Sequence, residues 1–268
     1  MVLDFVFIAI FQWGIVGAAA ATAVSQLIGG FAPLIYFYRP NTSRLKLVKT
    51  KTDTRVLLKT CINGSSELMT NISMSLVNIL YNFQLIRYVG EDGIAAYGVI
   101  MYVSFIFAAI FIGYAIGSAP VVGYHYGAGN HGELKGLFRK SICLITLWNM
   151  MLTTAAIITA QPLAQIFVGY DAELTALTRR GFCLYSLSFL ITGFNIFASA
   201  FFTALGNGVV SAAISFLRTL VFQIAAVLIL PLILGLDGIW LSIAAAEFLA
   251  LLVTVVCFVK YRGQYHYG

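Results

Sequence analysis

The most informative pattern in the sequence is a series of long apolar segments joined by short polar breaks. No charged residue occurs between Phe5 and Tyr38. Because a helix needs roughly 20 apolar residues to cross a bilayer core, most of these segments can span a membrane. Helices are expected at about 2–12, 16–38, 60–88, 94–122, 142–168, 181–205, 209–234 and 239–259. The uncharged runs do not alternate and far exceed a barrel strand in length. We therefore predict an all-α, polytopic membrane protein.

The composition supports this class. Of the 268 residues, 60% are hydrophobic and 10% are charged, whereas a soluble domain is about half apolar and about one quarter charged. These values exclude an ordinary soluble enzyme, a disordered chain and a disulfide-rich secreted module. The cysteines and histidines show neither a metal-ligand spacing nor a nucleophile–base arrangement. We therefore expect no catalytic residue, no metal site and no cofactor beyond a coupling ion.

The basic residues are distributed unevenly among the breaks. Seven lie in the stretch 39–59, three lie in 123–140, and the tail carries Lys260 and Arg262. These three segments share one side if six helices separate the first from the last. Because cytoplasmic loops are enriched in Lys and Arg, we predict a multi-pass protein of the plasma (cytoplasmic) membrane with a cytoplasmic C-terminus. On the opposite side lie Arg87, Arg179 and Arg180. The net charge of +6 does not indicate a nucleic-acid partner.

The two ends of the chain resemble each other. Gly14 and Gly17 match Gly235 and Gly238, each pair 221 residues apart. Both segments run from a turn through one span to a basic exit. Same-direction repeats are a known plan of transporters, so we predict a repeating unit of about 220 residues with six helices. The intact protein would be about twice as long as this unit.

This repeat divides the chain into four parts. Residues 1–38 would end a preceding N-lobe, with a partial helix and one full span. Residues 39–59 would form a basic cytoplasmic loop between lobes, 60–260 a six-helix C-lobe, and 261–268 a cytoplasmic tail. The segment 2–12 reaches only about 16 Å as a helix, about half of a bilayer core. We expect the missing part of that helix, and the N-lobe, upstream; the alternative is a stretch lying in the membrane interface.

The segment 60–88 carries a polar stripe. Its members recur every three or four residues: Asn63, Glu67, Asn71, Ser75, Asn78 and Asn82. At 100° per residue they share one helix face, which cannot face lipid. Interhelical hydrogen bonding would explain the asparagines but leaves Glu67 without an obvious reason. We therefore expect Glu67 to face a transport cavity or to carry a proton.

Two further charged residues lie within apolar segments. Glu247 is near the middle of 239–259, and Arg218 lies ten residues after Gly208. The two could form a structural ion pair, or Glu247 could be functional. Arg218 could instead extend its charge to the cytoplasmic face. Asn195 places a thinner polar face on 181–205.

A glycine-rich stretch follows the segment 94–122. It contains Pro120, Gly123, Gly127 and Asn130, followed by basic residues. No strand precedes it, so it is not a phosphate-binding loop, and from the residues alone it is a turn or hinge beside the membrane. With Phe201–Gly208 and Gly235–Trp240, this stretch resembles motifs of the MATE (multidrug and toxic compound extrusion) family. The likeness extends over essentially the whole chain.

The resemblance implies a twelve-helix, two-lobed exporter that works by alternating access and is driven by proton or sodium entry. It implies that Glu67 occupies the helix that carries a cation-binding acid in some members. Asn195, which is neutral, occupies the position of a second acid in those members. We therefore expect Glu67, Asn71, Asn78 and Asn195 to bind the ion or a small, cationic organic substrate. We expect this chain to be inactive without its N-lobe. The alternatives are a flippase for lipid-linked substrates and a non-transporting membrane subunit.

Overall fold

The computed structural model describes residue 3 and residues 5–39 and 53–268, without the side chains of Ala9, Ser66, Glu67 and Met69. The chain forms two compact units, divided between Asp53 and Thr54. Most of the expected basic loop 39–59 lies outside the described residues.

The first unit consists of a short π-helix, η1 (Phe5–Ile10), and the helix α2 (Gly14–Tyr38). The chain reverses between them, and the ring of Phe7 stacks on that of Trp13 with centroids 5.3 Å apart. The 25 residues of α2 correspond to a helix of about 38 Å, which is long enough to cross a bilayer core. This helix matches the expected span 16–38.

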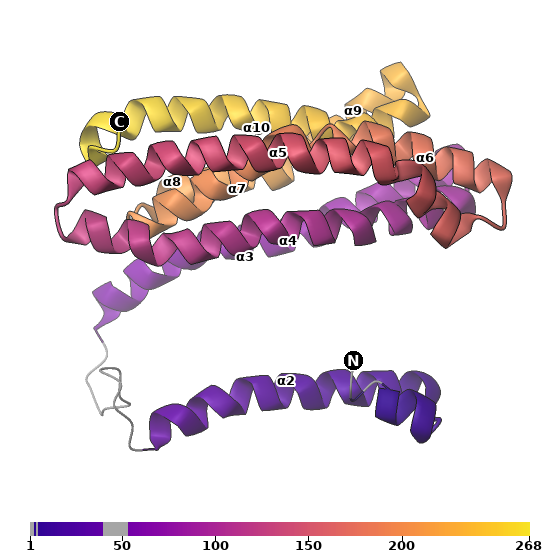
Figure 1. The fold of residues 1–268 in the computed structure, drawn as a ribbon, viewed down its shortest axis with the longest axis horizontal. Coiled ribbons are helices and arrows are strands. Elements are labelled where there is room, and N and C mark those ends of the chain that lie inside the picture. The colour runs from indigo at the N-terminus through magenta and orange to yellow at the C-terminus, as the bar shows by residue number, and fades with distance from the viewer. Residues whose placement is uncertain (1–2, 4, 40–52) are drawn as a thin grey trace. The chain divides into compact units, whose positions relative to one another are not determined.

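The second unit is a bundle of long helices that run side by side (Figure 1). The described part of this unit contains no strand. Its elements are α3 (Thr54–Val89), α4 (Glu91–Gly127), α5 (His131–Val168), α6 (Ala172–Ser186), α7 (Phe189–Ala204), α8 (Gly208–Phe216), η2 (Leu217–Phe222), α9 (Gln223–Leu234) and α10 (Leu236–Tyr265). The elements α8, η2 and α9 are consecutive parts of one span. With α6 and α7 counted as one bent segment, the unit has the predicted six helical segments.

Hydropathy and length identify most of these segments as membrane-spanning. Among the described residues, five helices are long and apolar enough to cross a membrane, or six if α6 and α7 count together. The helix α3 is not among them, although it has 36 residues. Its asparagines and serines lower its mean hydropathy. The long helix with the lower mean hydropathy is therefore the one that carries the polar stripe.

Several helix boundaries differ from the expected ones. α3 begins at Thr54 rather than near residue 60, α5 begins at His131 rather than near 142, and α10 continues to Tyr265 through most of the expected tail. Hydropathy marks only the part of a helix that lies in hydrocarbon. Lys and Arg are good helix formers, so these helices continue past the apolar segments.

The expected single helix 181–205 is also different. It corresponds to α6 and α7, which meet at a bend of 48°. At this bend the amide of Leu190 donates to the carbonyl of Leu187, a tighter pattern than in an α-helix. No proline lies in either helix, so hydropathy alone does not reveal the break.

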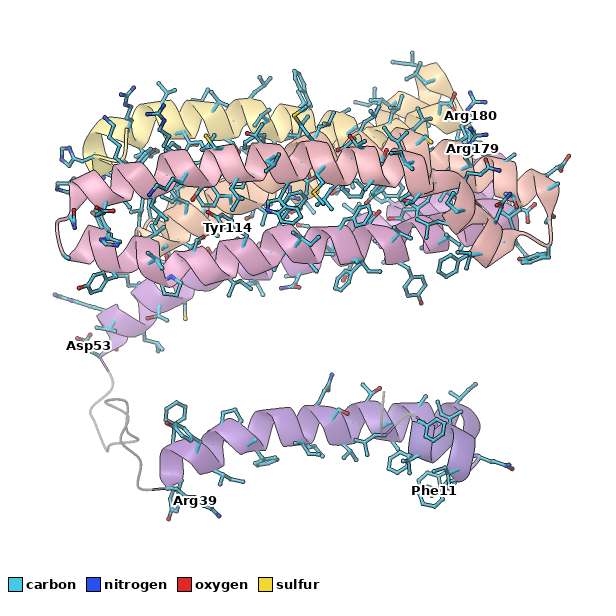
Figure 2. The ribbon with its side chains drawn as sticks, viewed as in Figure 1. Phe11, Arg39, Asp53, Tyr114, Arg179 and Arg180 are labelled. Atoms are coloured by element: carbon cyan, nitrogen blue, oxygen red, sulfur yellow. The ribbon has the colours of Figure 1, made fainter. Side chains whose placement is uncertain are left out.

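At one end of the bundle α3 and α5 begin and α10 ends (Figure 1), and basic residues are concentrated in these helix ends. They are Arg55, Lys59, Lys135, Arg139, Lys140, Lys260 and Arg262. The opposite end carries Arg87, together with Arg179 and Arg180, which Figure 2 labels. Arg180 is ion-paired with Asp237 there. The sequence assigns the basic segments of this unit to one side of the membrane. In the fold, these segments lie at one end of the bundle.

Two apolar clusters fill the interior. One, on the side of the α9–α10 turn, contains Trp240 and the stacked rings of Tyr81 and Tyr97. The other, towards the basic end, is rich in aromatic residues such as Phe201 and Tyr267. Burial raises the pKa of Tyr267 above its ordinary value, and its hydroxyl donates to the carbonyl of Phe258 at 2.9 Å. Along α7 and α10, a polar network lies between the two clusters.

Candidate functional site

The polar stripe of α3 lies on a face that this unit leaves largely uncovered. Asn71, Ser75 and Asn78 are exposed, and Asn82 is half-buried. The buried face of the same helix lies roughly 120° around the helix axis from the stripe. It contains Val77 and the buried residues one helical turn before and after Val77. The stripe is therefore separate from the face that packs into the bundle.

Glu67 lies on α3 one turn before Asn71. Its side chain is outside the described residues. Asn63, at the start of the stripe, differs from the others. It lies against Gly208 of α8, where an added Cβ would be 2.4 Å from the Asn63 Cα. The stripe thus begins in a close helix crossing and continues onto an uncovered face.

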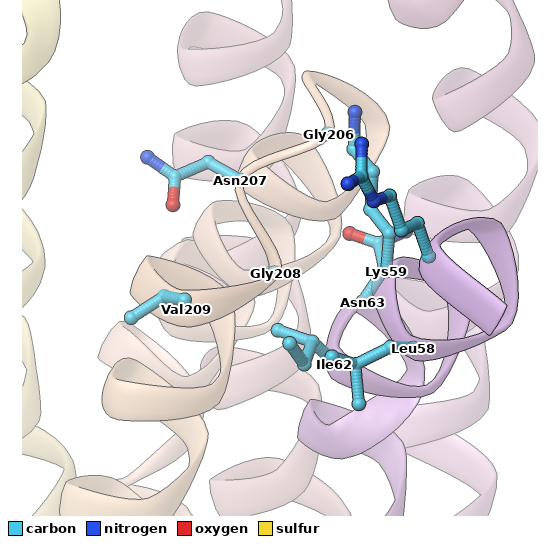
Figure 3. Close-up of a pocket in the computed structure, with 9 residues that line it drawn as sticks. Leu58, Lys59, Ile62, Asn63, Gly206, Asn207, Gly208 and Val209 are labelled. Atoms are coloured by element: carbon cyan, nitrogen blue, oxygen red, sulfur yellow. The ribbon is translucent and has the colours of Figure 1, made fainter.

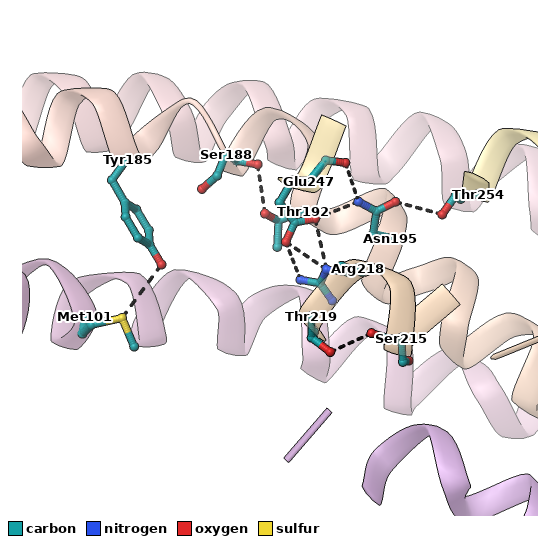
Figure 4. A network of polar contacts seen from close by, with 10 residues as sticks. All are labelled: Met101, Tyr185, Ser188, Thr192, Asn195, Ser215, Arg218, Thr219, Glu247 and Thr254. Atoms are coloured by element: carbon teal, nitrogen blue, oxygen red, sulfur yellow. Dashed lines mark hydrogen bonds and ion pairs between the residues drawn. The ribbon is translucent and has the colours of Figure 1, made fainter. Parts of the chain in front are cut away.

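A second polar site is buried in the middle of the bundle, where α7, η2 and α10 meet (Figure 4). The guanidinium of Arg218 contacts both carboxylate oxygens of Glu247. Its Nη2 lies 2.7 Å from Oε1, and its Nε lies 2.9 Å and 3.0 Å from Oε1 and Oε2. The exposed fractions of the two side chains are 17% and 6%. This bidentate arrangement is the geometry in which Arg binds a carboxylate most strongly.

Asn195 completes the same network. Its Nδ2 donates to Glu247 Oε2 at 2.7 Å and to the Glu247 carbonyl at 3.0 Å. Its Oδ1 accepts from the Thr254 hydroxyl at 2.9 Å. Asn195 is completely buried, and these contacts all lie within the bundle. Sequence reasoning did not select Thr254, although it lies seven residues after Glu247, on the same face of α10.

The network is best understood as a structural ion pair. An arginine guanidinium stays protonated in proteins. Loss of the negative charge on Glu247 would therefore leave Arg218 as a buried cation without its counter-ion, which is costly. The π-helical turn η2 carries Arg218. Chemically, this arrangement suits the joining of three helices better than the exchange of a proton.

Hydroxyl groups form further polar contacts, between α7 and α8. Ser199 Oγ lies 2.8 Å from Ser211 Oγ and 2.9 Å from Ser215 Oγ. Thr203 donates to Ser211 at 2.7 Å. Small hydroxyl residues let membrane helices approach closely and bond across the interface. One face of α7 is therefore polar and contains Asn195, Ser199 and Thr203.

The structure separates the residues that the sequence grouped as an ion or substrate site. Asn71 and Asn78 lie on the exposed face of α3, whereas Asn195 is committed to Glu247 and Thr254. The contact between Arg218 and Glu247, one of the alternatives that the sequence left open, is present. Arg218 therefore does not extend its charge to the end of the bundle.

The glycine-rich motif lies at the basic end. Pro120 and Gly123 are inside α4, and the helix continues to Gly127, beyond the expected end near 122. Gly123 faces the Ala204 carbonyl, 3.4 Å from an added Cβ. Asn130 caps α5 by accepting from the amide of Glu133 at 3.3 Å. The motif therefore forms a helix exit and a cap, and the turn itself is shorter than predicted.

A cavity of about 330 Å³ opens at the basic end, between α3 and the α7–α8 turn (Figure 3). Its charged lining consists of Arg55 and Lys59, and its apolar lining includes Leu58 and Ile62. The remaining lining residues are Asn63, Gly206, Asn207, Gly208 and Val209. None of the described residues that line it is acidic. This cavity lies far along α3 from Asn78 and is a separate feature.

A comparison with known families decides the assignment of the chain. The model of the MatE family matches residues 68–229, which is more than half of the sequence. The chain belongs to the MatE family. The match covers Arg218 and the part of the α3 stripe from Asn71 onwards, and it bears out the family resemblance of the sequence motifs.

Similar proteins agree with this membership. Multidrug export protein MepA of Staphylococcus haemolyticus (strain JCSC1435) is 24% identical over 248 residues, which cover 92% of this chain and 54% of that protein. The MepA of Staphylococcus saprophyticus subsp. saprophyticus (strain ATCC 15305) is 24% identical over 259 residues, with 96% and 56% covered. The chain spans about half the length of the curated relatives that it matches.

Solved structures show the same fold. A MATE crystallised in complex with MaL6 has a TM-score of 0.86 at 22% identity, covering 98% of this chain and 59% of that one. A MOP superfamily transporter from Pyrococcus furiosus Vc1, described as having a reverse-polarity binding pocket, has a TM-score of 0.85 at 23% identity, covering 98% of this chain and 59% of that one. At these identities the likeness establishes the architecture of a multi-pass helical membrane protein.

Proposed function

We propose that this chain is part of a cation-coupled antiporter that exports drugs or other small organic cations across the cytoplasmic membrane by alternating access. Family membership and the MepA relatives support export. The single structural observation that carries the proposal is the uncovered polar stripe of α3. A stripe of amides is unfavourable against lipid, so its natural surroundings are a water-filled cavity.

In this proposal, Glu67 alternately holds the coupling ion, a proton or sodium, and the cationic substrate. Asn71 and Asn78 lie on the same helical stripe and line the cavity beside it. Because one carboxylate cannot hold both cations at once, binding of one releases the other, and this competition gives antiport. Asn195 contributes indirectly, by holding Glu247 in the buried network.

The test is drug efflux from cells that express the complete gene product with Glu67→Gln. We expect efflux of a fluorescent organic cation to fall to the background of cells without the transporter. Glu91→Gln, which removes an acid from the exposed first turn of α4, is the matched control and should transport normally. Efflux with unchanged rate and unchanged dependence on the ion gradient in Glu67→Gln would reject the role of this acid.

The same proposal places the basic end of the bundle in the cytoplasm, consistent with the enrichment of Lys and Arg on that side. It also includes a second lobe as the partner of this one. The chain spans about half of its relatives, so we propose that residues 1–268 alone do not transport. Uptake or efflux by this chain reconstituted alone in liposomes would contradict that point.

The alternative of a flippase for lipid-linked substrates receives less support. Such a protein needs a wide, basic cavity within the membrane. Arg218 is the cation deepest in this bundle, and its charge is neutralised by Glu247. We therefore keep the export of organic cations as the proposed function, and a non-transporting subunit as the outcome if no substrate moves.

A further inference from the structure

We propose that the cavity between α3 and the α7–α8 turn binds the head group of an acidic phospholipid. This inference goes beyond the proposed transport and does not depend on it. It needs only that the bundle lies in a membrane with this end at the water interface. The cavity is lined by the start of α3 on one side and by residues 206–209 on the other (Figure 3).

The charge of the cavity favours an anion. Arg55 and Lys59 are four residues apart and therefore on one face of α3. The opposite wall is the N-terminus of α8, where helix geometry leaves amide groups and a partial positive charge. Asn207 caps one amide of this wall, because its Oδ1 accepts from Val210, and its Nδ2 donates to the hydroxyl of Tyr265. The remaining amides of the first turn keep their partial positive charge. None of the described lining residues is acidic, so the cavity disfavours an organic cation.

The apolar lining distinguishes a lipid from a free anion. Leu58, Ile62 and Val209 are exposed by 62%, 43% and 67%, and they continue from the basic residues towards the middle of the bundle. A phosphate held by Arg55 and Lys59 would leave its acyl chain against these side chains. Inorganic phosphate would not use them.

The length of α3 places this cavity at the right depth. Its 36 residues correspond to about 54 Å, whereas the hydrocarbon core is about 30 Å thick. The first turns of the helix therefore project into the head-group region. Lys and Arg at such positions keep their charge in water while their stems lie along apolar surface. The basic pair is thus at the level of lipid phosphates.

The backbones of α3 and α8 cross closely beside the cavity. A side chain at Gly208 would collide with the backbone of α3, because its Cβ would lie 2.4 Å from the Asn63 Cα and 2.8 Å from the Ile62 carbonyl oxygen. Glycine at this position lets the two helices meet directly. The residues at this meeting point, Ile62, Asn63 and Gly208, also line the cavity.

The experiment is native mass spectrometry of the purified full chain in detergent, titrated with phosphatidylglycerol or phosphatidylcholine. We expect the first phosphatidylglycerol to bind about tenfold more tightly than phosphatidylcholine, since two cations face its phosphate. Arg55→Gln combined with Lys59→Gln should abolish this preference. Lys135→Gln combined with Lys260→Gln removes the same charge from the same end, outside the cavity, and should retain it.

A second variant distinguishes binding in the cavity from a general attraction of the lipid to the basic end. Val209→Trp leaves every cation in place but fills the apolar side, so it should also weaken phosphatidylglycerol binding. Unchanged thermal unfolding shows that the variants fold. The proposal is overturned if the Arg55/Lys59 variant keeps the preference, or if the Lys135/Lys260 variant loses it equally. Complete displacement of the lipid by excess inorganic phosphate would also overturn it, since that outcome identifies a free-anion site.

Discussion

Arg218 and Glu247 are 29 residues apart in the sequence, yet they form the best-defined polar contact inside the bundle. Each carboxylate oxygen of Glu247 has a partner, and Asn195 connects the pair to Thr254 on α10. A satisfied buried network of this kind specifies how helices meet, although an apolar replacement can be equally stable. The network therefore fixes the register in which α7, η2 and α10 pack against one another.

This view predicts an asymmetry between single and double substitutions. Glu247→Leu alone should lower the free energy of unfolding by about 3–5 kcal/mol, because Arg218 would remain buried without a counter-ion. Arg218→Met combined with Glu247→Leu should recover most of that loss, since no buried charge remains. Denaturant unfolding in micelles, followed by tryptophan fluorescence, measures both. A double variant as unstable as the single one would show that the pair itself provides the stability.

At the scale of elements, three turns use the same Gly-x-x-Gly pattern. The first glycine of each has a positive φ: 55° at Gly14, 78° at Gly90 and 60° at Gly235. The glycine three residues later meets the preceding helix. An added Cβ at Gly17 would lie 2.9 Å from the Phe7 carbonyl oxygen, and one at Gly238 would lie 2.4 Å from that of Leu230. The glycines matched by the internal repeat therefore have the same structural role in both units.

This geometry predicts the effect of Gly238→Ala. Its Cβ would collide with backbone atoms of α9, which cannot move aside as a side chain would, so we expect destabilisation of about 1–3 kcal/mol. Gly117→Ala is the control, because nothing lies within 4 Å of an added Cβ there. That change should be neutral or stabilising by up to about 1 kcal/mol. Thermal unfolding of both variants measures the difference, and equal midpoints would contradict the close approach.

At the scale of the whole molecule, charge and hydropathy act on the same bundle. One end carries most of the basic residues of the second unit, and the other carries Arg87, Arg179 and Arg180. Apart from the polar stripe of α3, the outer surface of the bundle between them is mostly apolar, and the buried polar network lies at mid-length. These are the features by which a helical protein is held across a bilayer with one orientation.

The orientation can be measured by thiol labelling in a variant without native cysteines. Tyr170 is 83% exposed in the α5–α6 turn, and Gly263 lies near the end of α10 with open space around it. A membrane-impermeant maleimide should label Tyr170→Cys in intact cells. It should label Gly263→Cys only after permeabilisation. The opposite result would reverse the proposed orientation. The native residues to be replaced are Cys61, Cys143, Cys183 and Cys257.

The sequence alone determined the class of the protein, the number of helical segments in the second unit and the polar stripe of α3. These follow from local patterns, because hydrocarbon requires apolar residues in helical runs. The tertiary structure decided which polar residues meet. It joined Asn195 to Glu247 rather than to Asn71, added Thr254, and placed Arg55 and Lys59 opposite the start of α8. It also decided the bend between α6 and α7. Such features depend on the packing of distant helices, and no periodicity within one segment records which helix will lie beside it.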